Sequence, residues 1–167
     1  MPDPSEPAPH PDAVRLCPDC GLCCNGVLFD QVRLQPGDHP KALTAHGLKL
    51  KKGQWFNQPC TALCGTLCQI YEDRPIRCRQ FECRQYRQVA AGKISYESAV
   101  QRIGEVKQQV ARIEMLLATT GGGNLRKPLA QRYATAMETR RETVETTGLT
   151  AAMGRLQAGL DEWFRVG

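Results

Sequence analysis

Nine cysteines lie between Cys17 and Cys83, and none occurs in the rest of the chain. The first group reads Cys17-Pro-Asp-Cys20-Gly-Leu-Cys23-Cys24, so two residues separate successive cysteines until the last pair. Two intervening residues allow one tight turn to direct both sulfurs at a common point, as tetrahedral zinc ligation at about 2.3 Å requires. Two overlapping C-x-x-C spacings followed directly by a fourth cysteine therefore indicate a metal site.

The second group lies in the segment PCTALCGTLCQIYEDRPIRCRQFECRQY, residues 59–86. Cys60, Cys64 and Cys68 would share one face of a helix, but Gly65 weakens that interpretation. We therefore expect a loop in which one of these three cysteines is not a ligand. Metal bonds rather than a large apolar core must hold such a segment together, and we expect turns and short helices around them.

The beginning of the sequence lacks the basic start and apolar stretch of a secretory signal. No window approaches the roughly 20 apolar residues that a membrane-spanning helix needs. We therefore expect a cytoplasmic protein, where reducing conditions favour metal ligation over disulfides. An odd number of cysteines also fits poorly with a closed disulfide set.

The formal charge of +5 is counted with neutral thiols. Eight thiolates bound to two divalent zinc ions would lower it by four, so the basic excess nearly vanishes, and we do not expect nucleic acid as a partner. Cations near the last cysteines would stabilise thiolates, and binding of a phosphate or an acidic partner is their alternative role. These cations are Arg74, Arg77, Arg79, Arg84 and Arg87.

The cysteine pattern resembles the YkgJ-type cysteine-cluster family, whose CxxCxxCC domain is described as zinc- or iron-chelating. The resemblance rests on the first group and on Pro59-Cys60, Leu63, Cys68-x-Ile70-Tyr71, Arg74-Pro75, Cys78-Arg79, Phe81 and Cys83. Cys64 departs from the family pattern. The resemblance implies eight metal ligands: Cys17, Cys20, Cys23, Cys24, Cys60, Cys68, Cys78 and Cys83.

The sequence does not determine which metal the cysteines bind. Two zinc sites of four cysteines each would be closed and structural. The spacing of Cys17, Cys20 and Cys23, with one remote cysteine, also resembles that of a four-iron, four-sulfur cluster, and redox thiols without metal are a third alternative. The side chains of Tyr71 and Arg74 are expected to support the site, with Arg74 donating hydrogen bonds to ligand sulfurs or holding an anion.

The expected function is metal binding by zinc or iron-sulfur chelation, with no reaction assigned and no catalytic residue identified. One alternative is an iron-sulfur-dependent enzyme, because the family includes relatives similar to lysine N-methylases. No glycine-rich loop joins a strand to a helix as a nucleotide cradle would. Another alternative is a redox or metal sensor in which the spare Cys64 exchanges with a ligand thiol.

The remaining elements must position these cysteines. We expect a mainly α fold with an irregular, metal-organised, cysteine-rich N-terminal module and a C-terminal helical hairpin or bundle. The predicted divisions are a disordered proline-rich tail over residues 1–12, the cysteine-cluster module over 13–92 and a helical extension over 93–167. Within the module, Val27–Leu34 is predicted as a short strand, and Asp38 as the cap of a short helix.

In the helical extension, apolar residues recur at steps of three and four from Ser95 to about Ala118, which predicts a long amphipathic helix. This helix packs on its neighbours or, alternatively, binds a protein partner or a second copy through residues 95–118. A second helix is predicted to begin near Pro128 and to stop at Gly148, and Thr150 is predicted to cap a third.

Overall fold

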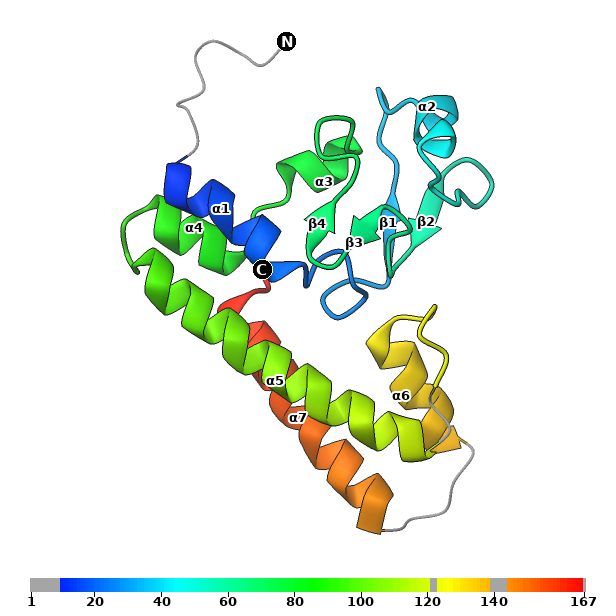
Figure 1. Ribbon diagram of the computed structural model, residues 1–167, viewed down its shortest axis with the longest axis vertical. Helices are drawn as coiled ribbons and strands as arrows, with labels where there is room; N and C mark the ends of the chain where they lie inside the picture. Colours follow the sequence, from blue (N-terminus) through cyan, green and yellow to red (C-terminus); the bar gives the residue numbers. More distant parts are fainter. Residues whose placement is uncertain (1–9, 121–122, 139–143, 167) are drawn as a thin grey trace.

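The computed structural model describes residues 10–120, 123–138 and 144–166. These residues form seven helices and four short strands (Figure 1), which confirms a mainly α fold. None of the helices in these ranges is both long and apolar enough to cross a membrane. The helices are α1 (Pro11–Cys20), α2 (Pro40–Ala45), α3 (Ile76–Gln80), α4 (Arg84–Ala90), α5 (Tyr96–Thr120), α6 (Leu129–Glu138) and α7 (Val144–Trp163), and the strands are β1 (Gln31–Arg33), β2 (Trp55–Asn57), β3 (Leu63–Cys64) and β4 (Leu67–Cys68).

Helix α5 runs the length of the helical half, as its periodicity predicted, with α7 lying along it (Figure 1). The apolar side of α5 packs on α7, α1 and α6, so its seam is covered within the chain. Binding of a partner or a second copy through residues 95–118 stays a prediction. The buried residues that meet here are Ala99, Ile103, Val106, Ile113 and Leu117 of α5 and Leu149, Ala152, Met153, Leu156 and Leu160 of α7.

The predicted helix stop at Gly148 and cap at Thr150 are wrong, because α7 continues unbroken through both. A glycine inside a helix costs about 1 kcal/mol relative to alanine. Burial of a single leucine such as Leu156 contributes about 1.5–3 kcal/mol, and several such residues of α7 lie in the core. Packing against α5 therefore outweighs the local preference.

Helix α6 begins at Leu129, directly after Pro128, as predicted. The backbone N–H of Leu129 donates to the carbonyl oxygen of Gly26 at 2.9 Å, which joins α6 to the loop that follows the first cysteine group. Gly26 has a φ of 83°, and a Cβ there would lie 3.1 Å from the Cα atom of Pro128. Residues 139–143 of the helix predicted from Pro128 to Gly148 lie outside the described residues.

The cysteine-rich half contains two small antiparallel hairpins, β1 with β2 and β3 with β4. The strand predicted over 27–34 is confined to Gln31–Arg33, where Val32 pairs with Phe56. A second, small apolar core covers this region, and it consists of Val32, Leu43, Leu48, Phe56, Ala62 and Ile70. The predicted loop over Cys60–Cys68 is confirmed as non-helical, although it forms a hairpin.

Asp38 does not cap the helix that follows it, because His39 occupies the N-cap position of α2. Its carboxylate instead accepts the backbone N–H groups of Gln35 at 2.7 Å and of Ile76 at 2.8 Å. Ile76 is the first residue of α3. The first N–H groups of a helix have no partner within that helix. Asp38 therefore fixes the start of α3 from a distant part of the sequence.

Residues 1–9 of the predicted tail over 1–12 lie outside the described residues. Pro11 and Asp12 already belong to α1. Ala13 and Leu16 of this helix are buried in the same core as α5 and α7. The first cysteines are thus carried by a helix that packs on the helical half.

Candidate metal site

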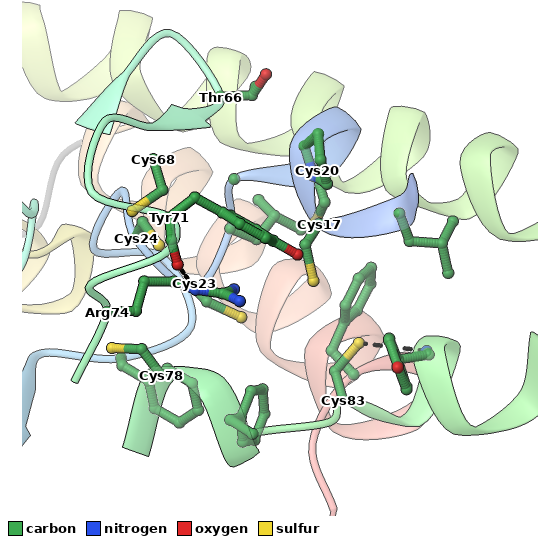
Figure 2. Close-up of a pocket in the computed structure, with 18 of the residues that line it drawn as sticks. Cys17, Cys20, Cys23, Cys24, Thr66, Cys68, Tyr71, Arg74, Cys78 and Cys83 are labelled. Atoms are coloured by element: carbon green, nitrogen blue, oxygen red, sulfur yellow. Dashed lines mark hydrogen bonds between the residues drawn. The ribbon is translucent and has the colours of Figure 1, made fainter. Parts of the chain in front are cut away.

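A cavity of about 1020 Å³ lies between α1, the β3–β4 hairpin, α3, α4 and the C-terminal end of α7 (Figure 2). None of the described residues that line it is a histidine, an aspartate or a glutamate. The structure therefore gathers cysteines from both sequence groups around one space. The cysteines that line it are Cys17, Cys20, Cys23, Cys24, Cys68, Cys78 and Cys83, seven of the eight expected ligands.

The end of α1 places the first two cysteines. Cys17 and Cys20 lie three residues apart on the helix, so they share one side of it. The helix ends at Gly21, which has a φ of 72° and donates its N–H to the Cys17 carbonyl oxygen at 3.2 Å. A Cβ at Gly21 would lie 3.3 Å from the Thr66 backbone, so the hairpin also requires glycine there. The tight turn expected between these cysteines is thus a helix end.

Contacts from α5 and α4 hold this end of α1 in place. The Tyr96 hydroxyl donates to the Asp19 carboxylate, and the Lys107 ammonium donates to the Asp19 carbonyl oxygen at 2.5 Å. Helix α4 packs on α1 and has Cys83 as its N-cap. The Cys83 sulfur accepts the Tyr86 N–H at 3.5 Å, so the sulfur is directed by the helix that it caps.

The hairpin and α3 supply the remaining cysteines, and the hairpin register explains Cys64. Leu63 pairs with Cys68, and Cys64 pairs with Leu67. Paired residues share a face of the hairpin and successive residues alternate, so Cys64 faces away from Cys68. Cys64 is exposed and is absent from the cavity lining. Cys60 is also absent from the lining, but it is half-buried and packs on the small core.

Burial dominates the electrostatics of these thiols. Burial, with a smaller contribution from neighbouring cysteines, raises the pKa of Cys20, Cys24 and Cys78 to about 12. Burial raises the pKa of Cys23 well above its usual range, and Cys20 and Cys83 add to that rise. The pKa values of Cys17, Cys60 and Cys83 are also raised, with burial as the largest cause. A bound cation would remove the repulsion that opposes ionisation.

Arg74 lies among the labelled cysteines of the cavity (Figure 2). Its guanidinium lies 3.5 Å from the Tyr71 ring centroid, and its Nε atom donates to the Tyr71 carbonyl oxygen at 2.7 Å. After the effect of burial, Arg74 lowers the pKa of Cys17, Cys24 and Cys78. Its position therefore supports the counter-charge role expected from the sequence.

The C-terminal end of α7 closes the cavity, which the sequence did not reveal. Phe164 and Gln85 line the cavity and are almost fully buried. The Arg84 N–H donates to the Phe164 carbonyl oxygen at 3.0 Å, and Gln85 Nε2 donates to the Trp163 carbonyl oxygen at 2.8 Å. These partners are about 80 residues apart in the chain, and only the aromatic pair at 163–164 could have drawn attention to this end.

The donor set fits zinc or an iron-sulfur cluster, because soft thiolates without carboxylate or imidazole favour those metals. Within residues 10–120, 123–138 and 144–166, no three cysteine, histidine or acidic side chains already converge closely enough to hold an ion. Ligation would therefore draw the thiols inward from the cavity wall. The histidines take no part in the lining, and His46 instead contacts Asp73 at 3.3 Å.

Residues 16–103 match the family model CxxCxxCC, described as a "Putative zinc- or iron-chelating domain", over more than half of the chain. The chain belongs to the CxxCxxCC family. This confirms the resemblance drawn from the residues and supports metal binding as the general function of this CxxCxxCC protein. No curated protein and no solved structure matches the chain.

Proposed function

We propose that this CxxCxxCC protein chelates zinc or an iron-sulfur cluster through eight cysteines. The observation that carries the proposal is the gathering of seven of them around one cavity free of other metal-binding side chains. The eighth, Cys60, donates its backbone N–H to the Cys24 carbonyl oxygen at 2.8 Å. The proposed ligands are Cys17, Cys20, Cys23, Cys24, Cys60, Cys68, Cys78 and Cys83.

The surroundings of the thiols favour a structural role for the metal. Phe29 and Phe81 pack edge to face with their centroids 4.8 Å apart, and Phe164 covers the α7 side. The bound metal would supply cross-links between segments that share little apolar core. We also propose a cytoplasmic location, where free thiols such as these nine stay reduced.

An iron-sulfur-dependent enzyme related to lysine N-methylases is the second candidate. The cavity volume of about 1020 Å³ favours it, because small-molecule sites typically occupy about 300–1,000 Å³. Titration of a methyl donor by calorimetry separates the candidates, since a structural site gives no binding heat. A sensor in which Cys64 exchanges with a ligand gains no such support, because the hairpin register turns Cys64 away from Cys68.

Metal content is the direct test of the proposal. We expect protein purified without oxygen to contain either about two zinc ions with no visible band, or about four irons per cluster with acid-labile sulfide and a broad band. Cys68→Ser should lose a large part of this metal, whereas the matched control Cys64→Ser should keep all of it. Wild-type protein without stoichiometric metal, after reconstitution with zinc and with iron and sulfide, would contradict the proposal.

Metal binding should also release protons. Seven of the eight proposed ligands have a raised pKa, so at pH 7 they are protonated and must each lose a proton on ligation. Affinity should therefore rise with pH, roughly tenfold per pH unit for each thiol that loses its proton. Zinc calorimetry in buffers of different ionisation enthalpy should give about one proton per ligand thiol. Release of fewer than about half that number would show that the thiols are ionised before binding.

A further inference from the structure

We propose that the eight cysteines form two separate four-thiolate metal sites, which share the cavity but not their ligands. This inference rests on the proposed function and divides its ligands into two sets. Four thiolates satisfy either a structural zinc ion or a four-iron cluster, so the division is independent of the metal. The helical site consists of Cys17, Cys20, Cys23 and Cys83, and the hairpin site consists of Cys24, Cys60, Cys68 and Cys78.

The two apolar cores divide six of the eight cysteines in this way. Cys20, Cys23 and Cys83 pack on the larger core, which α1, α5 and α7 share. A different set of cysteines packs on the small core beneath the hairpins, namely Cys60, Cys68 and Cys78. No cysteine belongs to both sets, so the two groups of thiols pack on two separate cores.

The elements that carry the helical site contact one another directly. Cys17 and Cys20 lie on one side of α1, and α1 packs on α4, whose N-cap is Cys83. Cys23 packs on the same large core as Cys20 and Cys83.

Cys24 belongs with the hairpin site although it follows Cys23 in the chain. Its carbonyl oxygen accepts the Cys60 N–H at 2.8 Å, which joins the two backbones. Cys60, Cys68 and Cys78 all pack on the small core beneath the hairpins. The adjacent pair at 23–24 is therefore the point at which the two sites meet.

Arg74 and Tyr71 lie between the two sets of thiols. Figure 2 shows the Tyr71 ring and the Arg74 guanidinium between Cys17 on one side and Cys24 and Cys68 on the other. Each metal bound by four thiolates would carry excess negative charge, so a cation between the sites reduces their repulsion.

Variants of one ligand from each site test the division in the full-length chain. Cys20→Ser should lose about half of the bound metal, Cys78→Ser should lose the other half, and the double variant should lose nearly all. Cys64→Ser is the matched control and should lose none. Loss of all metal from either single variant, or no further loss in the double variant, would overturn the division while leaving the proposed function intact.

A second measurement uses the wild-type chain, so that a variant that does not fold cannot hide the answer. Metal-free protein is given zinc at a series of ratios up to about two ions per chain, and free thiols are then alkylated and mapped by mass spectrometry. Protection should rise and fall together within each set of four, with Cys23 and Cys24 in different sets. Joint protection of Cys23 and Cys24 at all zinc ratios overturns the division, and no protection at any ratio overturns the proposed function as well.

Discussion

Removal of the metal is expected to unfold residues 31–80 while α5 and α7 stay paired. This segment is held by two-residue and three-residue strands, two helices of six and five residues and a six-residue apolar core. Isolated two-stranded hairpins are at best marginally stable in water, so metal bonds must supply much of the folding free energy here. The range excludes the first cysteine group, because Leu16 and Leu22 lie in the helical core.

Hydrogen exchange with mass spectrometry measures this result directly. After stringent chelation, amides in 31–80 should exchange faster by on the order of 100-fold or more, whereas those in 103–117 and 149–160 should change little. Zinc, or iron with sulfide, should restore the lost protection when added back. Equal loss of protection in both halves would show one cooperative unit, and unchanged protection in 31–80 would show that the metal does not hold this segment.

Phe164→Ala is expected to cost the metal-loaded protein about 3–5 kcal/mol of unfolding free energy. Phe164 is only 1% exposed, lies in the larger core and also lines the cavity. Truncation to alanine would remove the ring from both and leave a void, because the surrounding helices relax only in part. Its backbone contact to Arg84 does not depend on the side chain and should remain.

Urea denaturation followed by circular dichroism gives the size of this effect. Val144→Ala is the matched control, because Val144 is 90% exposed at the start of the same helix, and it should change stability by less than about 0.5 kcal/mol. A cost below about 1 kcal/mol for Phe164→Ala would mean that this end of α7 does not close the cavity in solution. Metal content of both variants should be measured at the same time, so that lost metal is not mistaken for lost packing.

Local features of the sequence were enough to predict the chemistry and the longest helix. The cysteine spacings identify the chemistry because thiolates bind soft metals whatever the surrounding fold. The steps of three and four along 95–118 predict α5 to within two residues at its end, because helix periodicity is a property of neighbouring residues. Pro128 before α6 is another local signal that the structure confirms.

Contacts between distant residues decided the features that the sequence predicted wrongly. Gly148 and Thr150 look like a helix boundary, but burial of α7 against α5 outweighs that preference. Asp38 looks like a local cap, but its carboxylate meets the N-terminus of α3, 38 residues away. In each case a tertiary contact is stronger than the local signal, and the local sequence does not contain that contact.

The sequence by itself predicted that this protein binds metal through thiols, while the tertiary structure decided how the cysteines are arranged. The register of the β3–β4 hairpin turns Cys64 away from Cys68. Different cysteines pack on each of the two apolar cores. Phe164 reaches the same cavity from the other end of the chain. Ligand type is a property of single residues, but ligand grouping depends on which segments pack together, and that is settled only when the whole chain folds.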